Sequence, residues 1–158
     1  MQTRQVRRVV TGHKPNGEAT IAIDEMSRDI VSFRPGATIF NIWSAPVLAD
    51  NSDPHDGAKS IVGTAMKGRS VFRVIEYAPG VAPRNHRTDS IDYAVVLSGE
   101  IIMEIDHEEV DLRAGDVLVQ RGTIHNWVNR GTQPCVIAFV LIDAAPVNVA
   151  GRELSPVG

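Results

Sequence analysis

The sequence predicts an all-β protein, on the strength of two observations. Short runs rich in β-branched and aromatic residues alternate along the chain with turn signals such as Pro15-Asn16-Gly17, Pro35-Gly36, Pro79-Gly80 and Ser98-Gly99. The only segments with helical character are short. This rhythm of strands and turns is typical of a sandwich or a barrel. The chain has 158 residues, which is enough for one domain with its own core.

The expected strands follow one another along the whole chain. An edge strand at Val6–Val10 and a strand at Thr20–Ile23 form a hairpin that turns at Lys14–Gly17. Five further strands are expected at Thr38–Trp43, Ser70–Tyr77, Tyr93–Leu97, Ile101–Ile105 and Val117–Gln120. An apolar run at Cys135–Leu141 completes the set.

The connections complete the expected organisation. Short helical pieces are expected at Ala58–Ile61 and at Asp24–Asp29, and Asp50–Gly57 is expected to be a surface loop, with a cover for the barrel mouth as the alternative. Residues 70–143 are expected to form the barrel, and residues 1–69 to extend it and to contribute a dimer interface. Residues 144–158 are expected to be an irregular tail.

Composition and charge bear on the partners and the compartment. The net charge of −3 gives no reason to expect nucleic acid, and no apolar run is long enough to span a membrane. Met1–Gln5 lacks the apolar core of a signal peptide. Cys135 is the one cysteine, so no intrachain disulfide is expected, which fits a reducing cytoplasm. The edge strand Val6–Val10 would be partly unpaired in a monomer, which predicts a homodimer.

Two histidines lie in a block with a distinctive spacing of glycines and polar residues. Its first half contains Gly80, His86, Thr88, Asp92 and Gly99. Its second half contains Gly115, Asp116, Gly122, His125 and Asn129. Because strand side chains alternate between faces, His86 shares a face with Thr88, Asp92 shares one with Ala94 and Val96, and His125 shares one with Trp127.

This block resembles the two-part signature of the cupin superfamily. The resemblance implies a double-stranded β-helix, or jelly-roll, barrel with an N-terminal strand extension. It also implies that these faces point into the barrel, so that a pocket is lined by His86, Thr88, Asp92, Ala94, Val96, His125 and Trp127. A few polar groups in an apolar cavity suit a small-molecule ligand.

Cupins often hold one metal ion, and the resemblance carries His86, Asp92 and His125 onto metal-ligand positions. Thr88 stands where the family has a second histidine, and Asp92 stands where it has a longer glutamate. The two histidines and Asp92 either hold a divalent ion such as Zn, Fe, Mn or Ni, or act without one. Without a metal, the histidines would be a hydrogen-bonded pair, and Asp92 would pair with Arg87 or with a strand-end amide.

The resemblance implies a small-molecule enzyme. We expect lyase-, isomerase- or decarboxylase-like proton transfer on a carbonyl- or phenol-containing substrate, with His86, His125 and Asp92 as catalytic residues. The alternatives are a dioxygenase with iron on His86, Asp92 and His125, and a noncatalytic ligand-binding module. Trp127 would either stack on substrate or pack in the core. Arg73 lies on one strand with Glu76 but on the other face, and the pattern does not say which side chain points inward.

Overall fold

Strands make up most of the structure, a computed structural model that describes residues 4–28 and 30–158. The strands are β1 (Arg7–His13), β2 (Ala19–Met26), β3 (Ile30–Val31), β4 (Ala37–Pro46), β5 (Arg69–Tyr77), β6 (Ser90–Ser98), β7 (Glu100–Ile105), β8 (Glu108–Arg113), β9 (Val117–Arg121), β10 (Asn126–Val128), β11 (Cys135–Asp143), β12 (Val147–Val149) and β13 (Arg152–Leu154). One 3-10 turn among the described residues, η1, spans Gly57–Lys59. The start of the Met1–Gln5 segment lies outside the described residues. Within them, no helix is long and apolar enough to cross a membrane.

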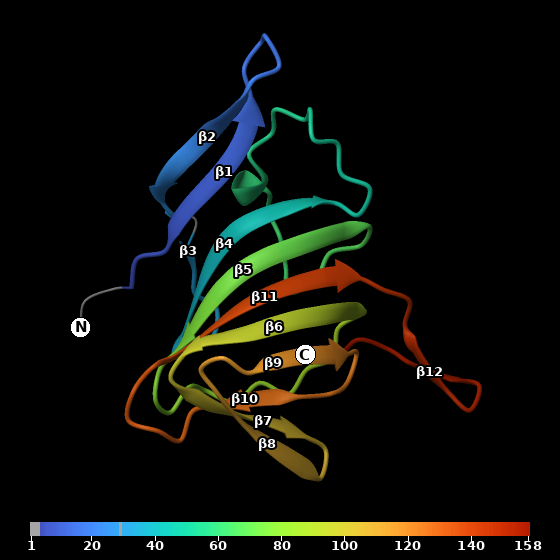
Figure 1. Cartoon of the computed structure of the whole chain (residues 1–158). Coiled ribbons are helices and arrows are strands. Elements are labelled where there is room, and N and C mark those ends of the chain that lie inside the picture. Colours follow the sequence, from blue (N-terminus) through green and yellow to red (C-terminus); the bar gives the residue numbers. More distant parts are fainter. Residues whose placement is uncertain (1–3, 29) are drawn as a thin grey trace.

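Two sheets enclose the core (Figure 1). The larger sheet has the strand order β3-β4-β5-β11-β6-β9, and the smaller sheet has the order β10-β7-β8, with antiparallel neighbours throughout. Val71, Ile137 and Val96 of the larger sheet belong to one buried cluster with Met103 and Trp127 of the smaller sheet. This is the expected double-stranded β-helix. The N-terminal part contributes β3 and β4 to the larger sheet, next to β5.

Strand β6 shows why the sequence forms these sheets. Its even-numbered residues Asp92, Ala94 and Val96 are buried, whereas Tyr93 and Val95 between them are exposed. This alternation is the period-two pattern of a strand with one face on the core. The chain then turns sharply at Gly99, where φ is 77° and a Cβ atom would lie 2.5 Å from a backbone oxygen of Pro134. Only glycine fits that turn without strain.

The helical piece expected at Asp24–Asp29 is wrong for its described residues. Strand β2 continues through Met26, in register with β1, so that Asp24 lies opposite Val9. The side chain of Asp24 binds the Arg7 guanidinium across the hairpin. This cross-strand pairing outweighs the local sequence, which is short and polar. Asp29 lies outside the described residues.

The tail after Pro146 is not irregular as expected. Strands β12 and β13 form a hairpin, and Val157 then makes a backbone bridge with Arg87. The hairpin turns at Ala150 and Gly151, whose φ angles are 50° and 78°. Positive φ at both central residues marks the turn that suits a tight hairpin, which asparagine followed by glycine usually signals. Alanine at the first position hides that signal in the sequence.

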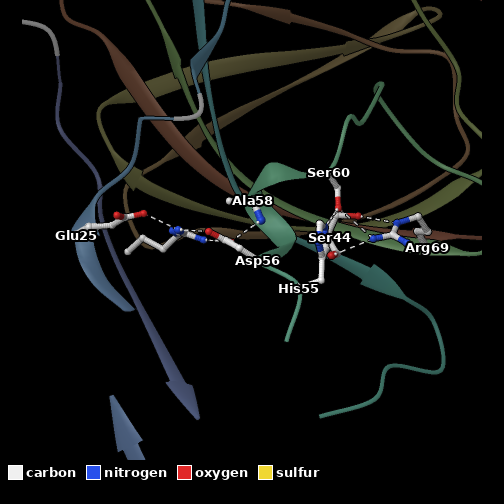
Figure 2. Close-up of polar contacts among 8 residues, drawn as sticks. Glu25, Ser44, His55, Asp56, Ala58, Ser60 and Arg69 are labelled. Carbon is white, nitrogen blue, oxygen red and sulfur yellow. Dashed lines mark hydrogen bonds and ion pairs between the residues drawn. The ribbon is translucent and has the colours of Figure 1, made fainter. Parts of the chain in front are cut away.

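The hairpin β1–β2 is fixed to the body of the protein by a buried arginine. The side chain of Arg8 is 1% exposed and binds the carboxylates of both Asp56 and Glu25 (Figure 2). Asp56 also accepts a hydrogen bond from the backbone of Ala58 at the start of η1, 3.0 Å away. Asp56 therefore joins the hairpin to the loop Asp50–Gly57, which lies on the surface.

The outer face of the larger sheet is partly uncovered. Val6 packs over Phe40, Val74 and Val136 on this face. Beside them, six apolar side chains between 38% and 74% exposed form what we call the outer patch: Phe72, Tyr93, Val95, Leu97, Val117 and Val119. The strand register places Tyr93 opposite Val119 and Val95 opposite Val117. Such a contiguous apolar surface is unusual on a monomer.

We expect a homodimer in which a second copy covers the outer patch. Val119→Lys places a charge in that patch, so it should turn the dimer into a monomer in light scattering at micromolar concentration. The matched control is Val110→Lys on β8, which is exposed but outside the patch. A wild-type protein with a monomeric mass would contradict the prediction.

We expect Asp56→Ala to lower the free energy of unfolding by about 3 kcal/mol, because it removes a carboxylate from a buried guanidinium. The matched control is Asp24→Ala, which breaks the solvent-exposed pair with Arg7 and should lower the free energy of unfolding far less. Urea denaturation of both variants measures the difference. Equal effects would show that burial of Arg8 does not govern the attachment of the hairpin.

Candidate functional site

His86 and His125 lie opposite each other on two neighbouring segments of backbone. The N–H of His86 donates to the carbonyl oxygen of His125 at 3.1 Å, and the N–H of His125 donates to the carbonyl oxygen of His86 at 3.0 Å. Directly opposed residues of an antiparallel pair direct their side chains to the same side. The two ring centroids are accordingly 4.2 Å apart, and the residues are 6% and 3% exposed.

A local hydrogen bond orients each imidazole in the same way. Nδ1 of His86 lies 3.2 Å from the carbonyl oxygen of Arg84, and Nδ1 of His125 lies 3.0 Å from that of Thr123. A carbonyl oxygen only accepts, so Nδ1 carries the proton in both rings. In the neutral state each Nε2 therefore presents a lone pair. No hydrogen bond between described residues engages either Nε2.

Burial keeps this pair neutral at pH 7. Burial first, and then repulsion from His125 and from the guanidinium groups of Arg84 and Arg34, lowers the pKa of His86 to about 4. The pKa of His125 is also lowered, by burial first and then by Arg84 and Arg34. A positive charge on one ring would further oppose protonation of the other, so near neutral pH each imidazole keeps only its Nδ1 proton.

Arg34 holds the two histidine-bearing segments together. Its Nε donates to the carbonyl oxygen of Ala82 at 2.6 Å. Its Nη2 donates to the side-chain oxygen of Asn126 and to the carbonyl oxygen of Trp127. The Asn126 side-chain oxygen also accepts from the backbone N–H of Arg84, 2.9 Å away. These bonds tie the segment before His86 to the segment after His125.

The histidines line a cavity with a volume of about 50 Å³ between the two sheets. That volume holds a few water molecules or one small ligand group. Eight of the sixteen lining residues have apolar or aromatic side chains: Phe33, Ala37, Ile39, Ile75, Tyr77, Trp127, Phe139 and Leu141. Polar or charged side chains complete it: Arg34, Thr64, Arg73, Arg84, His86, Asp92, Gln120 and His125. The loop Asp50–Gly57 contributes no residue to this lining.

Asp92 forms part of a polar row along one face of β6. Its Oδ1 accepts from the hydroxyl of Ser90 at 2.6 Å, and the hydroxyl of Thr88 lies 2.9 Å from that of Ser90. Since the Ser90 proton points to Asp92, Thr88 donates to Ser90. Burial raises the pKa of Asp92 to about 6, against the opposing effects of Ser90 and the Arg73 guanidinium. Arg87 binds the carbonyl oxygen of Ser155 instead of pairing with Asp92.

The other expected pocket residues have different positions. Trp127 lines the cavity, but it is 3% exposed and packs edge-on against Phe139 with ring centroids 5.6 Å apart. The described residues that line the cavity do not include Thr88, Ala94 or Val96. Ala94 and Val96 lie in the buried core.

The donor set does not fit a metal bound by His86, Asp92 and His125 together. Within the described chain, no three side chains of His, Cys, Asp or Glu are grouped closely enough to hold an ion. Asp92 is a methylene shorter than the glutamate of the cupin motif, and Ser90 binds one of its oxygens. The two imidazoles can offer at most two protein ligands through Nε2.

Arg73 and Gln120 are cavity residues that the sequence reasoning did not select. Each is 3% exposed and lines the cavity. Arg73 points inward from β5, which answers the question of whether Arg73 or Glu76 lies on the inner face. An arginine inside the apolar run from Val71 to Ile75 is the signal that could have identified it. Gln120 lies opposite Asp92 in the pairing of β9 with β6.

Comparison with known proteins gives a consistent family match. Residues 73–142 match the family described as Cupin domain. The chain is 35% identical to "Cupin-domain-containing oxidoreductase fogC" of Aspergillus ruber, over 95% of this chain and 78% of that protein. It is also 35% identical to "Oryzines biosynthesis cluster protein J" of Aspergillus oryzae, over 95% of this chain and 89% of that protein. The polyketide cyclase RemF of Streptomyces resistomycificus has a similar fold, with a TM-score of 0.51 and 18% identity over 89% of this chain and 79% of its own.

The two perturbed pKa values predict opposite effects on stability. Because the pKa of His86 is lowered from 6.5 to about 4, the unfolded chain binds more protons in that range, so stability falls as the pH falls. Because the pKa of Asp92 is raised from 3.8 to about 6, the folded chain binds more protons in that range, so stability rises as the pH falls. The lowered pKa of His125 acts in the same direction as that of His86, so Asp92 offsets part of the stability that the wild type loses as the pH falls.

We therefore expect Asp92→Asn to remove the compensating effect. Between pH 6.5 and pH 4 the variant should lose on the order of 2–3 kcal/mol more unfolding free energy than the wild type. Urea denaturation at a series of pH values measures this difference. The control is Asp111→Asn, an exposed position on β8. Parallel pH profiles for Asp92→Asn and wild type would contradict the buried environment of Asp92.

Proposed function

Because the chain belongs to the cupin superfamily, we propose that it is a small-molecule enzyme that transfers a proton within a carbonyl- or phenol-bearing substrate. The reaction is of lyase, isomerase or decarboxylase type. One observation carries the proposal: two neutral imidazoles lie with ring centroids 4.2 Å apart and line a mostly apolar cavity. An unprotonated Nε2 is a base that can accept a proton from a hydroxyl group or from a carbon next to a carbonyl group.

The lowered pKa values make each imidazole a weaker base, but they favour the return of a proton that it has accepted. When Nε2 of one histidine takes a proton from the substrate, the new imidazolium lies among the positive charges of Arg34 and Arg84. Those charges favour release of the proton to another atom of the same substrate. Proton removal at one atom and delivery at a second atom is an isomerisation, and delivery to a carbon that has lost CO₂ completes a decarboxylation. Neither step changes the oxidation state of the protein.

The relatives support a substrate from a biosynthetic pathway. One is named as an oxidoreductase, and one is named for a biosynthesis cluster. The word oxidoreductase favours a second candidate, a metal-dependent dioxygenase with iron at His86, Asp92 and His125. The described donor set does not group these three side chains, so we place the dioxygenase second. A noncatalytic module that binds a small ligand is the third candidate.

Hydrogen exchange tests the proton-transfer proposal without knowledge of the natural substrate. A panel of 1,3-dicarbonyl compounds and hydroxyaryl ketones is incubated with the protein in D₂O and followed by NMR. We expect the wild type to accelerate deuterium incorporation into at least one compound, and His125→Ala to slow it by about 10²–10⁴-fold. His107→Ala is the control, because His107 is exposed in the turn between β7 and β8.

The three candidates give different outcomes in this experiment. Proton transfer predicts exchange that survives treatment with a chelator. A dioxygenase predicts oxygen consumption that depends on added iron, together with stoichiometric metal in protein purified without a chelator or a metal-affinity column. Compounds that bind without exchange or oxygen consumption would favour the binding module. Either of the last two outcomes would contradict the proposal.

A further inference from the structure

Two buried donors in the cavity have no partner. Within the described chain, Nε of Arg73 and Nε2 of Gln120 are inaccessible to solvent and make no hydrogen bond. Both residues are 3% exposed and line the cavity with His86 and His125. Buried polar groups in native proteins are almost always hydrogen-bonded, because an unpaired one costs free energy. Two such donors on side chains that line one cavity therefore favour an acceptor there.

The other arginines of the cavity differ from Arg73 in this respect. Arg34 donates to Ala82, Asn126 and Trp127. Arg84 donates to the hydroxyl of Thr64 and to the carbonyl oxygen of Gly158. Among the described residues, the side chain of Arg73 makes one hydrogen bond, to the carbonyl oxygen of Gly63 at 2.6 Å. Of these three arginines, Arg73 is the one whose Nε is buried and has no hydrogen-bond partner within the described chain.

The charges around the cavity favour an anion. Three guanidinium groups, those of Arg34, Arg73 and Arg84, line it together with one carboxylate, that of Asp92. None of the three forms an ion pair with the side chain of a described Asp or Glu. A buried cation without a paired anion is unfavourable, so an anionic ligand would stabilise this arrangement.

We propose that Arg73 and Gln120 bind the carboxylate group of an organic acid, and that the substrate is therefore a small carboxylic acid or carries its carboxylate at one end. The planar guanidinium and the amide together match two carboxylate oxygens. The apolar side chains of Ile39, Phe139 and Leu141 line the same cavity and would contact the hydrocarbon part. The inference rests on the proposed function in that it assigns the ligand to the cavity of the histidine pair.

Binding measurements test this inference directly. Acetate, propanoate and benzoate are titrated into the whole protein, each beside its neutral amide, with calorimetry and NMR shifts as the readouts. We expect the carboxylates to bind more tightly than the amides. Arg73→Met should weaken carboxylate binding about 10- to 100-fold, because a hydrogen bond to a charged group contributes about 1.5–3 kcal/mol. Gln120→Met should weaken it less, about 3- to 10-fold.

Two further variants control for unfolding and for general charge. Arg73→Lys keeps the charge but not the planar pair of donors, so it should bind carboxylates with intermediate affinity. Arg130→Met removes an exposed arginine that pairs with Glu104 and Glu109, and it should bind like the wild type. Arg73→Met should unfold at a urea concentration equal to or higher than that of the wild type, because an unpaired buried charge is replaced by an apolar chain.

The outcomes separate this inference from the proposed function. Equal carboxylate affinity in wild type and Arg73→Met would overturn it, and so would equal binding of acids and amides. Chloride or sulfate that competes as well as benzoate would also overturn it, since that result indicates a general anion site. If carboxylates bind through Arg73 but His125→Ala leaves deuterium exchange unchanged, the carboxylate site stands and the proton-transfer proposal fails.

Discussion

The backbone bridge between His86 and His125 is the constraint on which the site depends. Its two reciprocal hydrogen bonds place the imidazoles on one side of the paired segments. Each ring then donates through Nδ1 to a carbonyl oxygen of its own segment, which leaves Nε2 as the basic atom. Arg34 connects the flanking residues of both segments from a buried position. The geometry of the two bases thus comes from main-chain pairing and one arginine.

The cavity combines features that oppose maximal stability. The cavity holds the buried guanidinium of Arg73 with an unpaired donor, the buried carboxylate of Asp92 and two neutral histidines. Each of these groups contributes less to the stability of the fold than an apolar side chain of the same volume would. The two sheets tolerate this arrangement because a large apolar cluster surrounds it, including Val71, Ile137 and Met103. Concentration of such groups in one cavity is characteristic of functional sites.

Much of the fold could be predicted from the sequence, because strand alternation and turn residues are local signals. The strands at Ser70–Tyr77 and Tyr93–Leu97 lie inside β5 and β6. The local sequence failed to predict the structure in two places. Strand β2 extends through Asp24 because β1 pairs with it, and the tail hairpin turns at Ala150, where asparagine would have signalled the turn.

Part of the candidate site could also be predicted from the sequence, and part could not. The spacing of the motif identified both histidines, but the reach of a side chain across a cavity is not a property of spacing. In the structure, Asp92 accepts a hydrogen bond from Ser90, and it does not join the histidines in a group that could hold a metal. Arg73 and Gln120 come from β5 and β9, which meet around the cavity only through the order of strands in the sheet. Their unpaired donors become visible only when every neighbour is in place.

The protonation state of the histidine pair shows whether the two imidazoles are free bases. Long-range proton–nitrogen NMR spectra of protein labelled with ¹⁵N-histidine distinguish the two neutral tautomers and the imidazolium. The structure predicts that at pH 7 both His86 and His125 are neutral, with the proton on Nδ1 and a bare Nε2. Resonances of an imidazolium at pH 7, or of a ring with the proton on Nε2, would contradict the account of the pair as two free bases.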